Sequence, residues 1–245
     1  MINNDMAKSG KPFFQRRKYA STVTIIGGAL VILAFGGATF DDPLRQFSYD
    51  AFWIAVAAMG GIVRITASGF AALGTSGEGK KEAVAPELNT TGVYSLVRNP
   101  LYVGRVLTFT GLAFLTGVWE YGALVFLLSI LFYERVIAYE EQYLAQKFGD
   151  EYSKWCARVP VFLPKLTGWV TPRLKWWWRR LFFRETYKVL DLAATVTAYT
   201  VLKDYAATGN WAFSSVQLAA IIVLATGYVV ITSLKRFTRI FEGIS

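Results

Sequence analysis

Long apolar segments separated by short polar ones make up most of this 245-residue chain. The run from Tyr19 to Phe40 contains no charged residue, and a second apolar run from Ser48 to Leu73 is interrupted by Arg64. A helix needs roughly 20 apolar residues to cross the hydrocarbon core of a bilayer. The pattern therefore predicts two membrane-spanning helices in residues 19–75, after a polar cytoplasmic tail over residues 1–18.

Four more apolar segments follow, and the first two of them form a tight helical hairpin. They are Leu101–Val118, Tyr121–Val136, Tyr187–Leu202 and Trp211–Leu234. The sequence therefore predicts an all-α polytopic membrane protein with about six transmembrane helices.

The polar segments between these spans divide the rest of the chain into three regions. Residues 76–164 contain the hairpin and most of the unusual polar residues, and residues 187–245 contain the last two spans and the tail. Residues 165–186 are basic and aromatic, with three consecutive tryptophans at 176–178. This composition is typical of a segment in the headgroup region, so we expect an interfacial helix or turn there.

Basic residues lie on one side of the predicted membrane topology. The N-terminal tail, the loops after the second and fourth spans, and the C-terminal tail are rich in lysine and arginine, whereas the opposite loops are short or acidic. By the positive-inside rule both termini and the hairpin ends are expected to be cytoplasmic. The net charge of +9 then indicates a membrane face, and no nucleic-acid partner is predicted.

The absence of one residue type excludes several kinds of chemistry. The chain has no histidine and a single cysteine, Cys156. This composition excludes a Ser-His-Asp triad, a histidine general base and a histidine-ligated metal or haem, and we predict no metal site. Charged residues gather at one interface instead of the bilayer midplane, which disfavours a transporter.

The first polar motif runs from Gly92 to Gly104 and contains Arg98-Asn99-Pro100. Asparagine is a good N-cap and proline fits the first helical position, so a helix is expected to start here. Free backbone N–H groups beside a guanidinium make an anion site. A second interpretation, left open by the sequence, is that Arg98 anchors this end of the span to lipid phosphates.

The second motif continues the fourth span with Glu134-Arg135 and Glu140-Glu141. Glu134 and Glu141 fall on one helical stripe, Glu140 points about 100° away from Glu141, and Arg135 belongs to a separate polar face. Carboxylates at this place suit an amine or a sulfonium cation. A solvated, salt-bridged helix end is the alternative interpretation.

A third motif follows, with Phe148-Gly149-x-x-Tyr152 and Arg158-Val-Pro160 ending at Pro164. Gly149 is expected to end one helix, and Asp150 to begin the next. Taken in order, the three motifs resemble the isoprenylcysteine carboxyl methyltransferase and phospholipid methyltransferase superfamily, over about Thr91 to Pro164. The family commonly has a histidine where this chain has Asn99.

The resemblance implies a membrane-embedded enzyme that binds S-adenosylmethionine at its cytoplasmic face, without a Rossmann fold. Arg98 would then bind the carboxylate of the cofactor, Glu140 or Glu141 its amino group, and one of the tyrosines its adenine or sulfonium. The expected cofactor-binding residues are Tyr94, Arg98, Asn99, Tyr102, Gly104, Glu140, Glu141 and Tyr152. Arg135 would orient an anionic acceptor, and Glu134 or Glu141 would act as the base for an amine.

The acceptor expected from the resemblance is a membrane lipid or a prenylated molecule. Its reacting group, whether carboxylate, phosphate, amine or thiol, stays open. Two other functions also remain open: an NADPH-dependent membrane reductase of the sterol type, and a non-catalytic membrane scaffold that has kept the fold.

Overall fold

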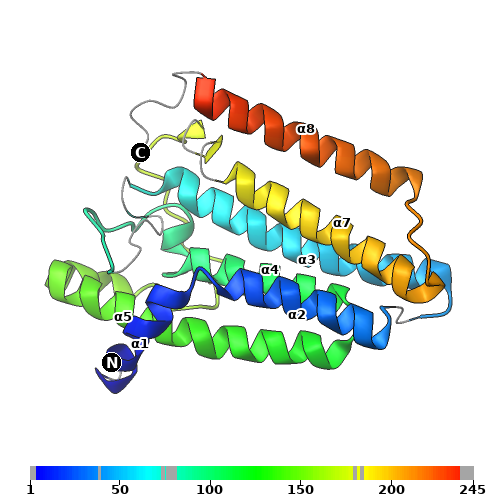
Figure 1. The fold of residues 1–245 in the computed structure, drawn as a ribbon. Coiled ribbons are helices and arrows are strands. Elements are labelled where there is room, and N and C mark those ends of the chain that lie inside the picture. Colours follow the sequence, from blue (N-terminus) through cyan, green and yellow to red (C-terminus); the bar gives the residue numbers. More distant parts are fainter. Residues whose placement is uncertain are drawn as a thin grey trace. The chain divides into compact units, whose positions relative to one another are not determined.

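A computed structural model describes residues 4–37, 40–72, 75, 82–178, 181–182 and 185–237 of the chain. Within these ranges it contains seven α-helices and one short 3-10 helix (Figure 1). The helices are α1 (Asn4–Arg16), α2 (Ala20–Phe35), α3 (Pro43–Phe70), η1 (Val93–Ser95), α4 (Pro100–Leu115), α5 (Trp119–Cys156), α7 (Thr186–Thr208) and α8 (Ser215–Phe237). The described part has one isolated β-bridge and no named strand, which confirms the all-α prediction there.

Three of the described helices, α3, α5 and α8, are long and apolar enough to cross a membrane. The pair α1 and α2 makes a fourth candidate if the two helices are counted as one span, with a bend of 67° between them. Helix α4 has only 16 residues, or about 24 Å at the usual rise per residue. Helix α7 has 23 residues but carries lysines and aspartates near both ends. Apolar helices thus indicate a membrane protein, and the six-span topology stays a prediction.

Two regions differ from the elements predicted for them. The described part of the expected polar tail forms helix α1, which continues through Pro12. The first predicted span ends at Phe35 instead of Phe40, because Gly36 has a φ of 79° and leaves the helix there. Residues 76–81 of the hydrophilic loop, 179–180 and 183–184 of the interfacial segment, and 238–245 of the tail lie outside the described residues.

The chain divides into two compact units. The first consists of Met1–Ala20, Ile62–Val106 and Leu127–Trp176, and the second of Ser21–Gly61, Leu107–Phe126 and Trp177–Ser245. Buried residues of the first unit include Ala67, Leu88, Tyr94, Tyr152, Trp155 and Val159, which pack as one cluster. Two of the residues expected to bind a cofactor, Tyr94 and Tyr152, belong to this cluster.

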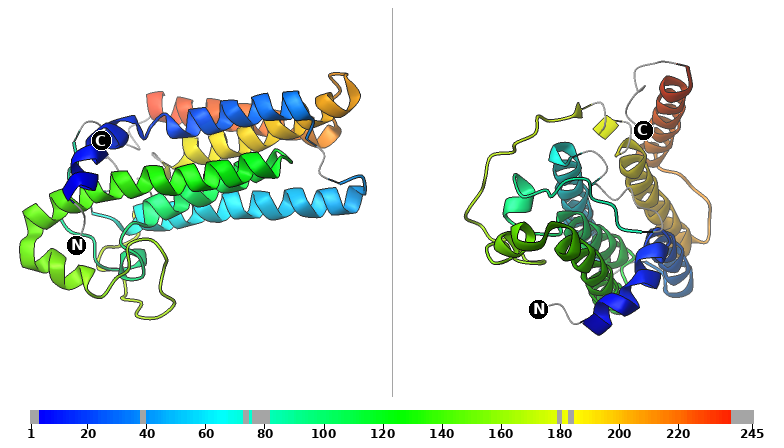
Figure 2. Two further views of the ribbon diagram at one scale, coloured as in Figure 1. Left: turned by 90° about the horizontal axis from the view of Figure 1, so that it is seen from below. Right: turned by 90° about the vertical axis from the view of Figure 1, so that its left-hand side faces the viewer.

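Helix α5 changes direction at Gly149, and this bend completes the core of the first unit. Gly149 has φ 50° and ψ −119°, a conformation that glycine adopts without a Cβ penalty. Figure 2 shows the last part of α5 turning away from the long part. The Trp155 indole then donates a hydrogen bond to the Tyr94 carbonyl oxygen at 3.3 Å. The predicted helix break at Gly149 is thereby confirmed.

Helix α1 packs closely against the polar stretch of α5. The Arg135 guanidinium donates a hydrogen bond to the Ser9 hydroxyl at 2.9 Å, and the Phe14 and Tyr139 rings lie 5.2 Å apart. A Cβ at Gly10 would overlap the Arg135 carbonyl oxygen and crowd Tyr139. The absence of a side chain at this position therefore permits the close contact between the helices.

Substituting Gly10 with valine is expected to detach α1 from α5. The added side chain has no room against the α5 backbone, and overpacking of this kind costs about 1–3 kcal/mol. Limited proteolysis of the detergent-purified chain should cut α1 several times faster in Gly10→Val than in wild type. Ser9→Ala, which removes one hydrogen bond without adding volume, serves as the control. Equal cleavage rates in all three proteins would contradict the packing described.

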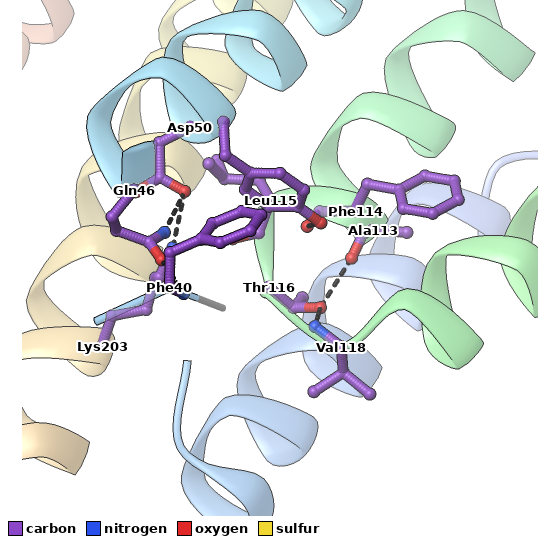
Figure 3. Close-up of polar contacts among 10 residues, drawn as sticks. Phe40, Gln46, Asp50, Ala113, Phe114, Leu115, Thr116, Val118 and Lys203 are labelled. Atoms are coloured by element: carbon purple, nitrogen blue, oxygen red, sulfur yellow. Dashed lines mark hydrogen bonds and ion pairs between the residues drawn. The ribbon is translucent and has the colours of Figure 1, made fainter. Parts of the chain in front are cut away.

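In the second unit, a buried ion pair joins the start of α3 to the end of α7. The Lys203 ammonium lies 2.7 Å from the Asp50 carboxylate, with side-chain exposures of 9% and 21% (Figure 3). Lys203 also donates to the Leu115 carbonyl oxygen at 3.2 Å, and Gln46 donates to Asp50 at 3.0 Å. Three segments of the second unit are thus held by one pair of opposite charges.

Candidate functional site

The central feature of the first unit is an ion pair between Arg98 and Glu141. The Arg98 Nε and Glu141 Oε1 atoms are 3.4 Å apart, and the side chains are 13% and 2% exposed. Burial is the largest single influence on the pKa of the Arg98 guanidinium and lowers it, but Glu141, Cys156 and Tyr152 together outweigh burial and raise the pKa above its usual value. Arg98 is therefore a permanent cation, held near the start of α4 by a carboxylate of α5.

Asn99 directly precedes α4, and its side chain contacts the Arg98–Glu141 pair. Its carbonyl oxygen accepts hydrogen bonds from the Tyr102 and Val103 amides at 3.1 Å each, which confirms the predicted helix start. Its side-chain NH₂ group donates to Glu141 Oε1 at 3.1 Å and to the Val161 carbonyl oxygen at 3.2 Å. The Asn99 amide thus fixes the carboxylate that Arg98 neutralises.

The chain after α5 holds the Arg98 segment in place through its backbone. The Arg98 amide donates to the Pro160 carbonyl oxygen at 2.9 Å, and the Lys165 amide donates to the Leu96 carbonyl oxygen at 3.1 Å. Farther on, the Gly92 amide donates to the Val170 carbonyl oxygen at 2.8 Å. Residues 160–170 therefore run as a strap along residues 92–98. Residues 165–170 of the predicted interfacial segment belong to this strap and are not helical.

Tyr152 brings a further polar group to the Arg98–Glu141 pair. It is 4% exposed, and its hydroxyl interacts electrostatically with Glu141, Cys156 and Arg98. Among the described residues the Tyr152 hydroxyl and Arg98 Nε have no hydrogen-bond partner of normal geometry. Most buried polar atoms in proteins have a hydrogen-bond partner, so these two atoms are donors that a bound group could use. A guanidinium and a hydroxyl suit the carboxylate of an amino acid, and a carboxylate beside them suits its ammonium group.

Replacing Asn99 with aspartate is expected to destabilise the first unit more than replacing it with alanine. Aspartate would set a second carboxylate against Glu141 and an acceptor against the Val161 carbonyl, whereas alanine only removes the two donors. Lost bonds to a buried charge cost about 1.5–3 kcal/mol, and like charges add to that. Denaturant unfolding in detergent would measure the difference. Equal stability of the two variants would show that the Asn99 amide does not face the carboxylate.

A second polar group of residues lies on the neighbouring face of α5, and we call it the arginine–tyrosine cluster. Its members are Arg17, Arg64, Tyr102, Arg105, Tyr133 and Glu140. The Tyr102 and Tyr133 rings stack with centroids 5.0 Å apart. The Glu140 carboxyl interacts electrostatically with Arg17, Arg105 and the Tyr102 hydroxyl. Tyr133 interacts in the same way with Arg105, Arg64 and Arg17.

The structure does not bring every predicted site residue to these two groups. Glu134 is exposed, whereas Glu141 on the same helical stripe is buried. The two residues lie two turns apart, and other segments pack over the helix at Glu141 but not at Glu134. Arg135 contacts Ser9 of α1. Tyr94 packs below Tyr152 and Trp155 in the core, and Gly104 is buried within α4.

Sequence reasoning overlooked two arginines of the arginine–tyrosine cluster. Arg105 lies one helical turn after Tyr102 in an otherwise apolar span, and Arg17 belongs to a basic stretch taken as a tail. A charged residue inside a span is a signal of function in its own right, so Arg105 was detectable. The Arg64 guanidinium, the charge that interrupts the second apolar run, donates to the Leu101 carbonyl oxygen at 3.5 Å.

Comparison with known proteins shows which family and which proteins the chain is similar to. Residues 51–151 match the phospholipid methyltransferase family, a range that includes both polar groups except for Arg17 and Tyr152. Nickel-cobalt-cadmium resistance protein NccN of Alcaligenes xylosoxydans xylosoxydans is 28% identical over 155 residues, which cover 63% of this chain and 68% of that protein. No solved structure matches the chain.

Two relatives with an enzyme name also match. Protein-S-isoprenylcysteine O-methyltransferase of Schizosaccharomyces pombe is 28% identical over 157 residues, or 58% of this chain and 66% of the enzyme. Methanethiol S-methyltransferase 1 of Bradyrhizobium diazoefficiens is 36% identical over 85 residues, or 34% of this chain and 28% of the enzyme. These matches confirm the resemblance drawn from the three motifs.

Proposed function

We propose that this chain, a relative of the phospholipid and isoprenylcysteine methyltransferase superfamily, is an integral membrane methyltransferase that uses S-adenosylmethionine. The family match and the enzyme relatives support methyl transfer, and the apolar helices support a place in the membrane. The identity of the cofactor is proposed from the residues of the site, and the acceptor is proposed from the resemblance to the family.

The observation that carries the proposal is the buried Arg98–Glu141 pair with Tyr152 beside it. Arg98 and the Tyr152 hydroxyl would bind the carboxylate of the amino-acid part of the cofactor, and Glu141 would accept from its ammonium group. When bound, S-adenosylmethionine supplies an electrophilic methyl group on a sulfonium sulfur. The residues around it need only align the partners and exclude water, and the burial of Glu141 and Tyr152 suits that task.

The remaining expected site residues have proposed roles that differ with the acceptor. Tyr94, Tyr102 and Gly104 would shape the cofactor-binding segment at the start of α4. Glu134 would act as a base only toward an amine, because a carboxylate, phosphate or thiolate acceptor has no proton to remove at the reacting atom. Arg135 would orient an anionic acceptor. We propose that the cofactor approaches from the cytoplasm and that the acceptor carries a lipid or prenyl chain.

Calorimetry with S-adenosylmethionine tests the proposal on detergent-purified protein. Wild type should bind the cofactor, whereas Arg98→Ala and Glu141→Ala should lose binding because each removes one half of the amino-acid site. Glu151→Ala is the matched control, since Glu151 is an exposed carboxylate of the same helix. Transfer of a radiolabelled methyl group into membrane lipid extracts would then identify the acceptor.

The result that overturns the proposal is an absence of binding in well-folded wild-type protein with membrane lipids added back. NADPH would be the next ligand to test, because a sterol-type reductase also needs a basic pocket. If neither cofactor binds, a scaffold role becomes the better explanation. Undiminished binding in both alanine variants would place any cofactor site elsewhere.

A further inference from the structure

The strap, residues 160–170, exposes several large apolar side chains. It is not helical, and Figure 2 shows it as part of an irregular yellow-green trace outside the helices. Leu166 is 97% exposed and Leu163 is 80% exposed. The other exposed large apolar residues of the strap are Val161, Trp169 and Val170. Apolar side chains gathered on a surface mark a place of interaction with a protein or a membrane.

The backbone of the strap is bound to the first unit, so these side chains are what its surroundings meet. Besides the contacts with residues 92–98 described above, the Val170 amide donates to the Ser95 hydroxyl at 3.0 Å. A little farther on, the Trp176 ring packs against Phe70, the last residue of α3, with centroids 4.8 Å apart. The strap therefore lies where one candidate membrane span, α3, ends and where α4 begins.

This part of the chain also carries positive charge. From Ala157 to Trp178 the sequence has no acidic residue and four basic ones, which are Arg158, Lys165, Arg173 and Lys175. Arg173 forms an ion pair with Glu87, and positive charge stays in excess when that carboxylate is counted. Tryptophan and basic residues beside apolar side chains are typical of a segment in the headgroup region. Anionic headgroups attract such a segment more strongly than neutral ones.

The same strap holds residues of the proposed cofactor site. The Val161 carbonyl oxygen accepts from the Asn99 side chain, which also donates to Glu141, and the Pro160 carbonyl oxygen accepts from the Arg98 amide. A contact that stabilises the attached strap therefore stabilises the arrangement that would bind the cofactor. By thermodynamic linkage, two ligands that favour the same arrangement strengthen the binding of each other.

We propose that the exposed side of the strap binds the anionic surface of the surrounding bilayer, and that this contact strengthens S-adenosylmethionine binding at the Arg98–Glu141 pair. The inference rests on the proposed function and names a regulator of its site, the lipid headgroups. A bilayer is favoured over a protein partner because the exposed side chains combine apolar, aromatic and basic types, and because the apolar helices of the same chain bring a bilayer beside the strap.

Fluorescence quenching in nanodiscs tests the lipid contact. Leu166→Cys in a Cys156→Ser background carries one environment-sensitive label, and Glu151→Cys in the same background carries a control label at an exposed polar position of α5. Brominated phosphatidylglycerol mixed with phosphatidylcholine should quench the label at position 166 several times more than the label at position 151. Equal quenching at the two positions would overturn the inference. A label at position 166 that is shielded from water but not quenched by lipid would indicate a protein partner, such as a second copy of this chain, and would overturn it as well.

Calorimetry with S-adenosylmethionine in nanodiscs tests the coupling. Wild type should bind the cofactor several-fold more tightly in nanodiscs that contain phosphatidylglycerol than in phosphatidylcholine alone. The double variant Leu163→Ser, Leu166→Ser should bind it equally in both, with the affinity that wild type has in phosphatidylcholine. Leu131→Ser changes an exposed leucine of α5 outside the strap and should keep the wild-type difference.

A wild-type affinity that is the same in both lipids, or a difference that the double variant retains, would overturn the inference. A failure of the proposed function gives another result, because wild type then binds no S-adenosylmethionine in either lipid. Quenching at position 166 supports the lipid contact even then, and only the coupling falls with the proposed function.

Discussion

Replacing Glu141 with glutamine is expected to weaken S-adenosylmethionine binding by at least about 30-fold, close to 2 kcal/mol, as for other buried charge pairs deprived of one partner. The substitution keeps the shape of the side chain and removes its charge. The cofactor ammonium then loses the counter-ion that the buried Glu141 carboxylate would supply. Calorimetric dissociation constants for the two proteins measure the effect.

Glu151→Gln provides the control, because it makes the same chemical change at an exposed position of α5. Unfolding midpoints of both variants separate a loss of binding from a loss of folding. A Glu141→Gln protein that is folded and binds the cofactor within about threefold of wild type would be incompatible with an ammonium contact at Glu141.

The second large effect is expected in the second unit, away from the three polar motifs in the sequence. Asp50→Ala should reduce the free energy of unfolding by about 3–5 kcal/mol, because it leaves Lys203 as a buried charge without its carboxylate. The Leu115 carbonyl oxygen, which also accepts from Lys203, is neutral and cannot replace the lost charge. Denaturant unfolding in detergent would measure the loss.

A double variant distinguishes an ion pair from a simple packing effect. Asp50→Ala combined with Lys203→Met removes both charges and keeps most of the apolar stem, so it should recover much of the lost stability. A double variant that is less stable than Asp50→Ala alone would mean that Lys203 is held by its carbonyl and packing contacts, and that its charge matters little.

Local signals in the sequence were sufficient to predict where the helices around the three polar motifs begin and end. Proline at 100 after an asparagine fixed the start of α4, and Gly149 fixed the break in α5, because both depend on backbone conformations that few residues adopt. The end of α2 was placed too late. The run of uncharged residues extends to Phe40, whereas the helix ends at Phe35 because Gly36 has a positive φ.

Contacts between distant segments could not be derived from such signals. Arg98 and Glu141 were each expected to bind the cofactor, but their pairing with each other depends on how α4 and α5 meet. Residues 165–170 of the strap were predicted as part of an interfacial segment, because their backbone partners, Leu96 and Gly92, lie far earlier in the sequence. Helix α1 was missed because its polar composition and Pro12 are typical of a tail, whereas its contact with α5 stabilises it.

The strap has a consequence for biosynthesis. Asn99 and Val161, whose side chain and carbonyl meet beside Glu141, are 62 residues apart in the sequence. Ribosomes add residues at about 5–20 per second, so Asn99 is synthesised about 3–12 seconds, and Glu141 about 1–4 seconds, before Val161. During that interval Arg98 and Glu141 lack the backbone partners that later enclose them. In a nascent chain arrested before Pro160 this charged helix end would therefore stay open to chaperones or lipid headgroups.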